Sequence, residues 1–261
     1  MGILNVTPDS FSDGGAYLDH DAAVARAEQM LDEGAAIIDV GPESTRPGSM
    51  PVAADEQIRR AVPVIQALHE RRPQAVISID TRSAVVAAAA RAAGASIVND
   101  ISALRDDPQM SELVRHTGAG VVLMHMRGTP ATMQADPHYD DVVAEVGEFL
   151  RERASWAESR GIARERIAVD PGIGFGKTIE HNLALLRGLE SLVDLGYPVL
   201  VGASRKSFIG KLLAAPDSAD RLAGSLACAL RAVVAGACVV RAHDVSMTVA
   251  LMNAACAQRP A

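Results

Sequence analysis

Polar side chains end most of the apolar runs of this chain. Three of these runs close on Asp80, Asn99 and Asp170. A buried strand favours apolar side chains throughout, so an acid or an amide at its end is costly unless it lines a site. Two carboxylates and one amide that converge can read the donor and acceptor edge of a flat heterocycle. The alternative is that each residue caps the next helix, because Asp and Asn are favoured caps.

Cationic residues end two further runs. Arg241 and His243 alternate within residues 239–244, so strand geometry predicts that both side chains lie on one face. A guanidinium and an imidazole there suit a phosphate or diphosphate, unless Arg241 instead pairs with an acidic neighbour. The other run ends in the Ser-Arg-Lys-Ser segment 204–207. Its backbone N–H groups and a helix end would attract an anion, with Lys206 adding charge, unless it is only a basic surface turn.

Other strand-end groups carry weaker signals. Asn5 offers a neutral oxygen that Mg²⁺ accepts beside water and phosphate oxygens. We expect Asp39 and His125 to support or pack, and Asp244 to cap a helix or support a neighbour rather than to catalyse. The glycine-rich segment 172–177 lacks the GxxxxGK[ST] spacing of a phosphate loop, so it does not predict nucleotide binding.

The elements that position these groups follow a regular order. Eight apolar runs alternate with segments of helical spacing, which predicts right-handed parallel βαβ units. The predicted strands are 2–7, 37–41, 76–81, 97–100, 121–125, 168–171, 199–206 and 239–244. The predicted helices are 21–33, 55–71, 83–93, 108–116, 139–160, 179–195, 218–235 and 246–257.

Eight such units in 261 residues predict an α/β chain that forms a (β/α)8 TIM barrel, a single domain over residues 1–261. The active site of such a barrel lies at the C-terminal ends of its strands. A doubly wound sheet is the competing fold, but no GxGxxG follows the first strand. Segments 7–15 and 42–49 are too long for simple turns, and their place over the strand ends predicts two lids.

Bulk properties exclude several classes of protein. A net charge of −7 argues against nucleic acid as the main partner. The longest apolar stretch, residues 222–240, is interrupted by Arg231 and Gly236, so it predicts a buried helix and a strand and not a membrane span. Three cysteines without metal-binding spacing, and no signal-peptide pattern, indicate a cytoplasmic protein with reduced thiols.

In their common order, the motifs resemble those of the dihydropteroate synthase family, the pterin-binding enzymes of folate biosynthesis. The segments that carry the resemblance are 1–15, 43–48, 79–81, 99–100, 124–126, 170–175, 204–207 and 241–244. The resemblance implies a barrel that condenses a pterin-methyl diphosphate with p-aminobenzoate. Diphosphate is released and 7,8-dihydropteroate is formed. One departure is Pro42, where the family has Gly, because proline fixes φ and removes an N–H.

The resemblance also implies roles for single residues. Asn5 would bind Mg²⁺, Arg241 and His243 would grip the diphosphate, and Asp13 and Arg46 would order the closed site. The implied pterin-holding residues are Asp80, Asn99, Asp170 and Lys206. Those that match the p-aminobenzoate pocket are Phe11, Thr45, Pro47, Phe175 and Ser207. Catalysis would rest on Asp80, Asp170, Lys206, Arg241 and His243.

Two other functions compete with this one. A pterin-binding methyltransferase on a related barrel could share the pterin acids, but it has no reason to retain Arg241 and His243 together. A non-catalytic pterin-binding paralogue would be expected to have lost some of the site residues, and this chain keeps them. The resemblance further suggests a homodimer through the last helices, unless their apolar residues face the barrel. These residues are Leu226, Leu230, Val234, Val249 and Met252.

Overall fold

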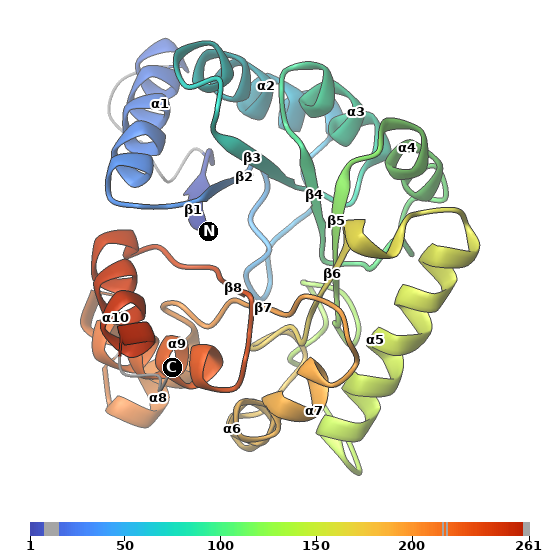
Figure 1. The fold of residues 1–261 in the computed structure, drawn as a ribbon, viewed down its shortest axis with the longest axis vertical. Coiled ribbons are helices and arrows are strands. Elements are labelled where there is room, and N and C mark those ends of the chain that lie inside the picture. Colours follow the sequence, from blue (N-terminus) through green and yellow to red (C-terminus); the bar gives the residue numbers. More distant parts are fainter. Residues whose placement is uncertain (8–15, 216, 218, 258–261) are drawn as a thin grey trace.

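The computed structural model describes residues 1–7, 16–215, 217 and 219–257. Parallel strands form an inner ring and helices form an outer layer (Figure 1). The strands are β1 (Gly2–Asn5), β2 (Ile37–Gly41), β3 (Val76–Asp80), β4 (Ile97–Asp100), β5 (Gly120–Met124), β6 (Ile167–Asp170), β7 (Leu200–Val201) and β8 (Val239–Val240). The predicted (β/α)8 barrel is confirmed, and the doubly wound sheet is excluded.

The ring is built from two pieces. Strands β1 to β6 pair in sequence order as one parallel sheet, and β7 pairs with β8. Single bridges join the pieces: Val199 pairs with Val169 of β6, and Ala242 pairs with Gly2 of β1. We call these two junctions the β6–β7 seam and the β8–β1 seam.

The helices surround this ring. They are α1 (Ala16–Asp32), α2 (Ala54–Arg71), α3 (Ala84–Ala92), α4 (Met110–Thr117), α5 (Val142–Ser159), α6 (Ile179–Arg187), α7 (Leu189–Val193), α8 (Ser207–Leu213), α9 (Leu222–Val234) and α10 (Val245–Ala257). Two short 3₁₀ turns lie at Arg164–Arg166 and Ala219–Arg221. Within the part of the chain that the structure describes, no helix is both long and apolar enough to cross a bilayer.

Two predicted helices differ from the observed ones. The helix predicted over residues 179–195 is divided into α6 and α7 at Gly188, a residue that favours helices poorly. A β-carbon at this position would lie 2.9 Å from the Val143 side chain, so the packing of α5 requires glycine there. The helix predicted over 218–235 begins as a 3₁₀ turn and becomes α-helical only at Leu222.

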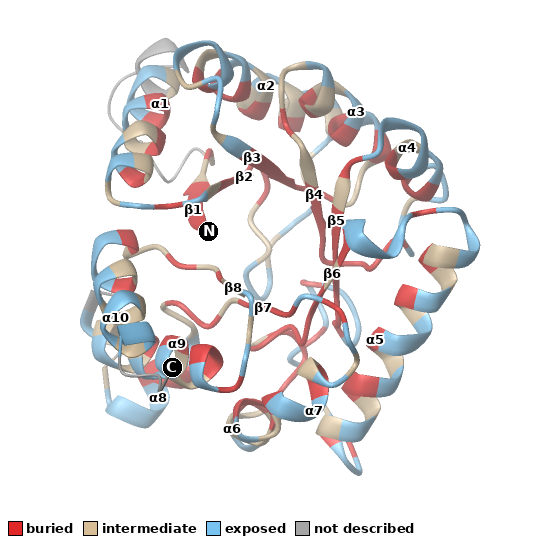
Figure 2. Ribbon diagram, in the orientation of Figure 1, coloured by how far each residue is buried: buried red, intermediate tan, exposed pale blue. Residues whose placement is uncertain are grey.

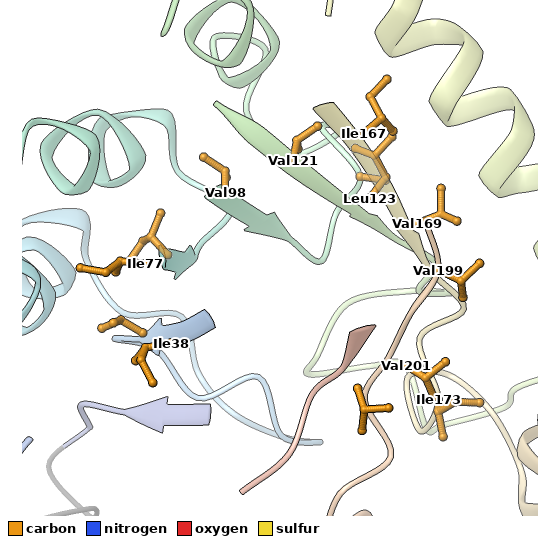
Figure 3. Close-up of a cluster of buried hydrophobic side chains, with 14 of the residues drawn as sticks. Ile38, Ile77, Val98, Val121, Leu123, Ile167, Val169, Ile173, Val199 and Val201 are labelled. Atoms are coloured by element: carbon orange, nitrogen blue, oxygen red, sulfur yellow. The ribbon is translucent and has the colours of Figure 1, made fainter. Parts of the chain in front are cut away.

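The main core lies between the strand ring and the helices. The inner faces of the helices and most strand residues are buried, while the outer helix faces are exposed (Figure 2). Aliphatic side chains such as Ile38, Ile77, Val98 and Val121 lie on the helix-facing side of the strands (Figure 3). Since side chains alternate along a strand, the residues next to these face the interior of the barrel. Those interior positions include the polar residues Asp39, Ser78, Asp80, Asn99 and Asp170.

Candidate active site

Four polar residues meet inside the barrel. Asp80 and Asn99 are register partners on β3 and β4, and both are buried. The Nδ2 of Asn99 donates to Oδ2 of Asp39 on β2 at 3.1 Å. Arg241 reaches across from the end of β8: its Nε donates to Oδ2 of Asp39 at 2.6 Å, and its Nη2 donates to Oδ2 of Asp80 at 3.0 Å. The structure thus joins three of the predicted site residues through Asp39, and Arg241 does pair with acidic neighbours.

Helix capping does not explain the strand-end acids and amide. Ser83 holds the cap position of α3 and Gln109 that of α4, so Asp80 and Asn99 are not caps. Asp170 does organise a turn, because its Oδ1 accepts the backbone N–H of Gly172 at 2.7 Å. Asp80 and Asn99 are instead held by side chains inside the barrel, Asp80 by Arg241 and Asn99 by Asp39.

The two site acids carry unusual proton affinities. Burial raises the pKa of Asp80 to about 7, helped by the negative charge of Asp39 and opposed by Arg241. Burial also raises the pKa of Asp170 to about 6, opposed by its bond from Gly172 and by the charge of Lys206. Both carboxyl groups therefore exchange protons close to neutral pH, where functional sites often place them.

Lys206 lies beside an aromatic ring. Its Nζ is 3.9 Å from the centroid of the Phe175 ring, which is a cation–π contact. Burial and the charge of Arg241 lower the pKa of Lys206 to about 8, while Asp170 and Asp80 oppose this shift. Lys206 occupies the position just before α8, so Ser207 is the first residue of that helix and is exposed. The structure thus places Lys206, expected at the pterin, against Phe175, expected in the p-aminobenzoate pocket.

Two side-chain pairs tie the segment after β7 to the segment after β8. The Oγ of Ser204 lies 3.1 Å from Nδ1 of His243, and the backbone N–H of His243 donates to the same Oγ at 3.2 Å. In the adjacent pair, Nε of Arg205 donates to Oδ2 of Asp244 at 3.0 Å. Burial and the charge of Arg241 lower the pKa of His243 to about 3, so its imidazole is neutral at pH 7. Asp244 thus accepts from a neighbouring side chain, and its expected lack of a catalytic role stays a prediction.

The segment after β2 is anchored at its base. Glu43 is buried, and its Oε1 accepts the backbone N–H of Val52 at 2.7 Å. Its Oε2 accepts from Nη2 of Arg82 at 3.4 Å. The carbonyl of Pro42 accepts from Arg60 at 3.0 Å, so the proline is held in a fixed position at the start of the loop.

The tip of this loop is more exposed than its base. Thr45 is half-buried, whereas Arg46 and Pro47 are exposed. None of the described carboxylates lies within ion-pair distance of the Arg46 guanidinium. The loop is fixed to the segment after β5, where Gly48 donates to the carbonyl of Pro130 at 3.0 Å. Phe11 and Asp13, predicted on the first loop, lie outside the described residues.

Asn5 is the predicted magnesium ligand. A β-carbon on Gly41 would lie 3.3 Å from Oδ1 of Asn5, so glycine at this position leaves room for the amide. The described residues contain no group of three or more His, Cys, Asp or Glu that could hold a metal. One neutral oxygen fits an Mg²⁺ ion that takes its other ligands from water and from substrate phosphates, and not a resident metal centre.

One buried cation escaped the sequence reasoning. Lys177 is 3% exposed, its Nζ lies 2.9 Å from Nδ1 of His125, and it donates to the Phe175 carbonyl at 2.9 Å. Gly172 lies over the same histidine with φ of +65°, and a β-carbon there would lie 1.9 Å from the His125 carbonyl oxygen. In the sequence, the signal for this lysine is the glycine-rich run 172–177, which does not fit a phosphate loop. It instead allows Lys177 to fold back beneath Phe175.

The sequence and the structure of this chain are both similar to those of known proteins. A profile of the family described as pterin binding enzyme matches residues 1–243. The dihydropteroate synthase of Escherichia coli strain K12 is 48% identical over 253 residues, which cover 97% of this chain and 89% of that protein. The chain also matches the solved Yersinia pestis dihydropteroate synthase with a sulfonamide drug complex, at 44% identity and a TM-score of 0.94, covering 100% and 94% of the two chains.

Two structures of the Xanthomonas albilineans dihydropteroate synthase are similar as well. The structure with 4-aminobenzoic acid gives 46% identity and a TM-score of 0.93, and that with 7,8-dihydropteroate gives 44% and 0.89. In each case the match covers 100% of this chain and 93% of the other.

Proposed function

The chain belongs to the pterin binding enzyme family, and from this premise we propose how its residues make 7,8-dihydropteroate. The activity is that of a dihydropteroate synthase in folate biosynthesis, a transferase. It condenses (7,8-dihydropterin-6-yl)methyl diphosphate with 4-aminobenzoate and releases diphosphate. The observation that supports our assignment of roles is the contact of Arg241 with Asp80. In this contact the residue that we assign to the diphosphate lies beside a residue that we assign to the pterin.

We assign the pterin to Asp80, Asn99, Asp170 and Lys206. The pterin ring presents both N–H donors and lone-pair acceptors on one edge. Buried carboxylates and the amide oxygen accept from the donors, while an ammonium can donate to the acceptors. In a site this far from water such hydrogen bonds discriminate strongly, because a wrong ligand leaves them unpaired.

We assign the diphosphate to Arg241 and His243, with Asn5 as a ligand of Mg²⁺. Bound Mg²⁺ would neutralise part of the negative charge that builds on the leaving diphosphate. The C–O bond of the pterin methyl group breaks, and its electron pair departs with the diphosphate. Arg241 donates to the developing charge, and the neutral His243 donates from its N–H, which stabilises the transition state. The resulting pterin-methyl cation is favoured by the nearby carboxylates of Asp80 and Asp170.

We assign the 4-aminobenzoate pocket to Phe11, Thr45, Pro47, Phe175 and Ser207, with Asp13 and Arg46 ordering the closed loops. The amine nitrogen of 4-aminobenzoate forms the new C–N bond with its lone pair. The nitrogen, now positively charged, then releases a proton to solvent. The carboxylate of 4-aminobenzoate rests near Ser207. We expect an ordered reaction: pterin diphosphate binds first, the loops close, and 4-aminobenzoate binds last.

We also infer the setting of the reaction. Residues 1–261 act as one domain, and the protein works in the cytoplasm without nucleic acid or membrane partners. It assembles as a homodimer through its last helices, where Leu230 and Val234 of α9 are exposed. The other residues expected there, Leu226, Val249 and Met252, are half-buried.

The test is release of diphosphate by the purified protein with Mg²⁺. Release should require both pterin diphosphate and 4-aminobenzoate, and removal of Mg²⁺ with a chelator should lower it. A well-folded preparation that forms no dihydropteroate would refute the function. Transfer of a methyl group from a methylated folate, with no use of diphosphate, would favour the methyltransferase.

A narrower test concerns Arg241→Ala. This variant should bind pterin diphosphate at least about tenfold more weakly, because it removes charge-assisted hydrogen bonds, while binding of free pterin changes little. Calorimetry with both ligands measures the difference. Equal losses for the two ligands would contradict the assignment of Arg241 to the diphosphate.

A further inference from the structure

Asp39 is a fully buried carboxylate that no assigned role includes. Its side chain is 0% exposed. Its Oδ2 accepts two hydrogen bonds, from Nε of Arg241 at 2.6 Å and from Nδ2 of Asn99 at 3.1 Å. Its Oδ1 is buried and has no hydrogen-bond partner within the described part of the chain. One oxygen is thus shared by two site residues, while the other is unsatisfied.

Stability does not account for this acid. Ile38 and Val40, its neighbours on β2, are buried and apolar, and they pack in the core between the strands and the helices. A carboxylate taken out of water is costly, and a lone oxygen without a donor adds to that cost. Replacing a buried ion pair by apolar groups is often neutral or stabilising. An acid kept here points to a task in the site.

The contacts define the task. When Nδ2 of Asn99 donates to Asp39, the amide cannot flip, and its Oδ1 is left to face a ligand as an acceptor. When Nε of Arg241 donates to Asp39 and its Nη2 to Asp80, the guanidinium plane is fixed at two points, and Nη1 remains for an anion. Both orientations depend on the same oxygen of Asp39.

We propose that Asp39 is a positioning residue that sets the pterin-reading amide of Asn99 and the diphosphate-gripping guanidinium of Arg241 in one common geometry. The proposal rests on the proposed roles of those two residues. Asp39 lies on β2, Asn99 on β4 and Arg241 beyond β8, so the link crosses the interior of the barrel. The reacting C–O bond lies between the pterin and the diphosphate, which is why their two holders must be aligned.

The test is Asp39→Asn, which keeps the shape but removes the charge. Its amide oxygen can accept the same two hydrogen bonds but carries no negative charge, so the bond from the Arg241 guanidinium loses its charge assistance and holds the arginine less firmly. We expect at least about a tenfold rise in KM for pterin diphosphate or an equal fall in kcat. KM for 4-aminobenzoate should stay within about twofold. Tm should fall, because removal of one partner of a buried ion pair leaves the charge of Arg241 less compensated.

Ser78→Ala is the matched control. Ser78 is the register partner of Asp39 on β3, it is also 0% exposed, and its Oγ has no partner among the described residues. This variant should keep the parental kinetic constants. Because the parent and this control report on the synthase activity itself, their failure would refute the function and not the role of Asp39.

A second variant of Asp39 and a double-mutant cycle with Asn99 test the positioning role further. Asp39→Leu removes the buried charge altogether; it should fold, and it should show the same selective loss. In a double-mutant cycle, Asp39→Asn should cost much less in an Asn99→Ala background, since one of its two targets is gone. Parental constants in both Asp39 variants would overturn the proposal. So would equal losses for both substrates that track a fall in Tm, because these would mark a purely structural residue.

Discussion

Three ionisable side chains inside the barrel have pKa values that lie close together. The pKa of Asp80 is raised to about 7 and that of Asp170 to about 6, whereas that of Lys206 is lowered to about 8. Burial is the first cause in all three, since it penalises whichever form is charged. Arg241 differs: burial acts to lower its pKa, but Asp39 and Asp80 outweigh this and raise it, so it stays charged.

These values predict a bell-shaped pH profile. Below about pH 6 to 7 the carboxyl groups of Asp170 and Asp80 gain protons and lose the charge that favours the pterin donors and the cation. Above about pH 8 Lys206 loses its proton. The value of kcat/KM for pterin diphosphate, which reports on the free enzyme, should therefore peak between about pH 7 and 8.

Lys206→Arg tests the alkaline limb of this profile. A guanidinium keeps its charge at every pH used, so the fall on the alkaline side should move upward or vanish, while the acid limb stays. If kcat/KM of the parent instead rises steadily from pH 5 to pH 9, or stays within about twofold over this range, the assignment of charges is contradicted.

Among the elements, the segment between β6 and α6 depends on a buried lysine. Lys177 satisfies Nδ1 of His125 and the Phe175 carbonyl. Burial lowers the pKa of Lys177 to about 7, and burial together with Lys177 lowers that of His125 to about 2, so the histidine is neutral and acts as the acceptor. The bond links the segments that follow β5 and β6.

Lys177→Met should disturb this segment more than the barrel. It orphans two buried acceptors, each at a cost of about 1–3 kcal/mol in the free energy of unfolding. Because Phe175 loses its anchor, KM for 4-aminobenzoate should rise several-fold, and KM for pterin diphosphate should change less. Chemical denaturation and steady-state kinetics measure the two effects.

Lys211→Met on α8 is the control, since Lys211 is exposed and the loss of charge is the same. It should leave both the unfolding free energy and the kinetic constants near those of the parent. An unchanged KM for 4-aminobenzoate in Lys177→Met would separate Lys177 from the pocket.

The sequence predicts elements better than it predicts contacts between them. Apolar runs alternate with segments of helical spacing that often end at glycine. This local pattern is enough to predict the eight strands and the polar residues Asp80, Asn99 and Asp170 at their ends. The break at Gly188 depends on the packing of Val143 from another helix, which no local pattern records. The contact of Arg241 with Asp39 joins residues 202 positions apart, so only the closed ring brings them together.

Across the whole molecule, one face stays apolar. Large hydrophobic side chains are exposed on α8, α9 and α10, and the most exposed of them is Val234, at 63%. The members of this set are Leu212, Leu213, Leu230, Val234 and Met247. These three helices are neighbours, since α9 contacts both α8 and α10. Exposed apolar side chains on neighbouring helices are consistent with the homodimer that we propose.

Val234→Asp should weaken the dimer. A carboxylate in an apolar interface must be desolvated, so the dissociation constant should rise at least about tenfold while the monomer keeps its Tm. Sedimentation velocity over a range of concentrations measures this. Val85→Asp on α3 is the control, because Val85 is 55% exposed and lies on a different helix. The same association in both variants would place the interface elsewhere.

In the complex that we propose, the substrate contacts the barrel on both sides of its two seams. The six-stranded arc carries Asp80, Asn99 and Asp170, whereas the β7–β8 ribbon leads into Lys206, Arg241 and His243. Among the described residues, backbone pairing between arc and ribbon is short: each seam has one bridge, and the β8–β1 seam adds a hydrogen bond from the Met1 amine to the Val240 carbonyl. A ligand that is held from both pieces therefore spans the joints where the backbone ladder is thinnest. Bound substrate should therefore stabilise the closed ring, because it connects the arc to the ribbon.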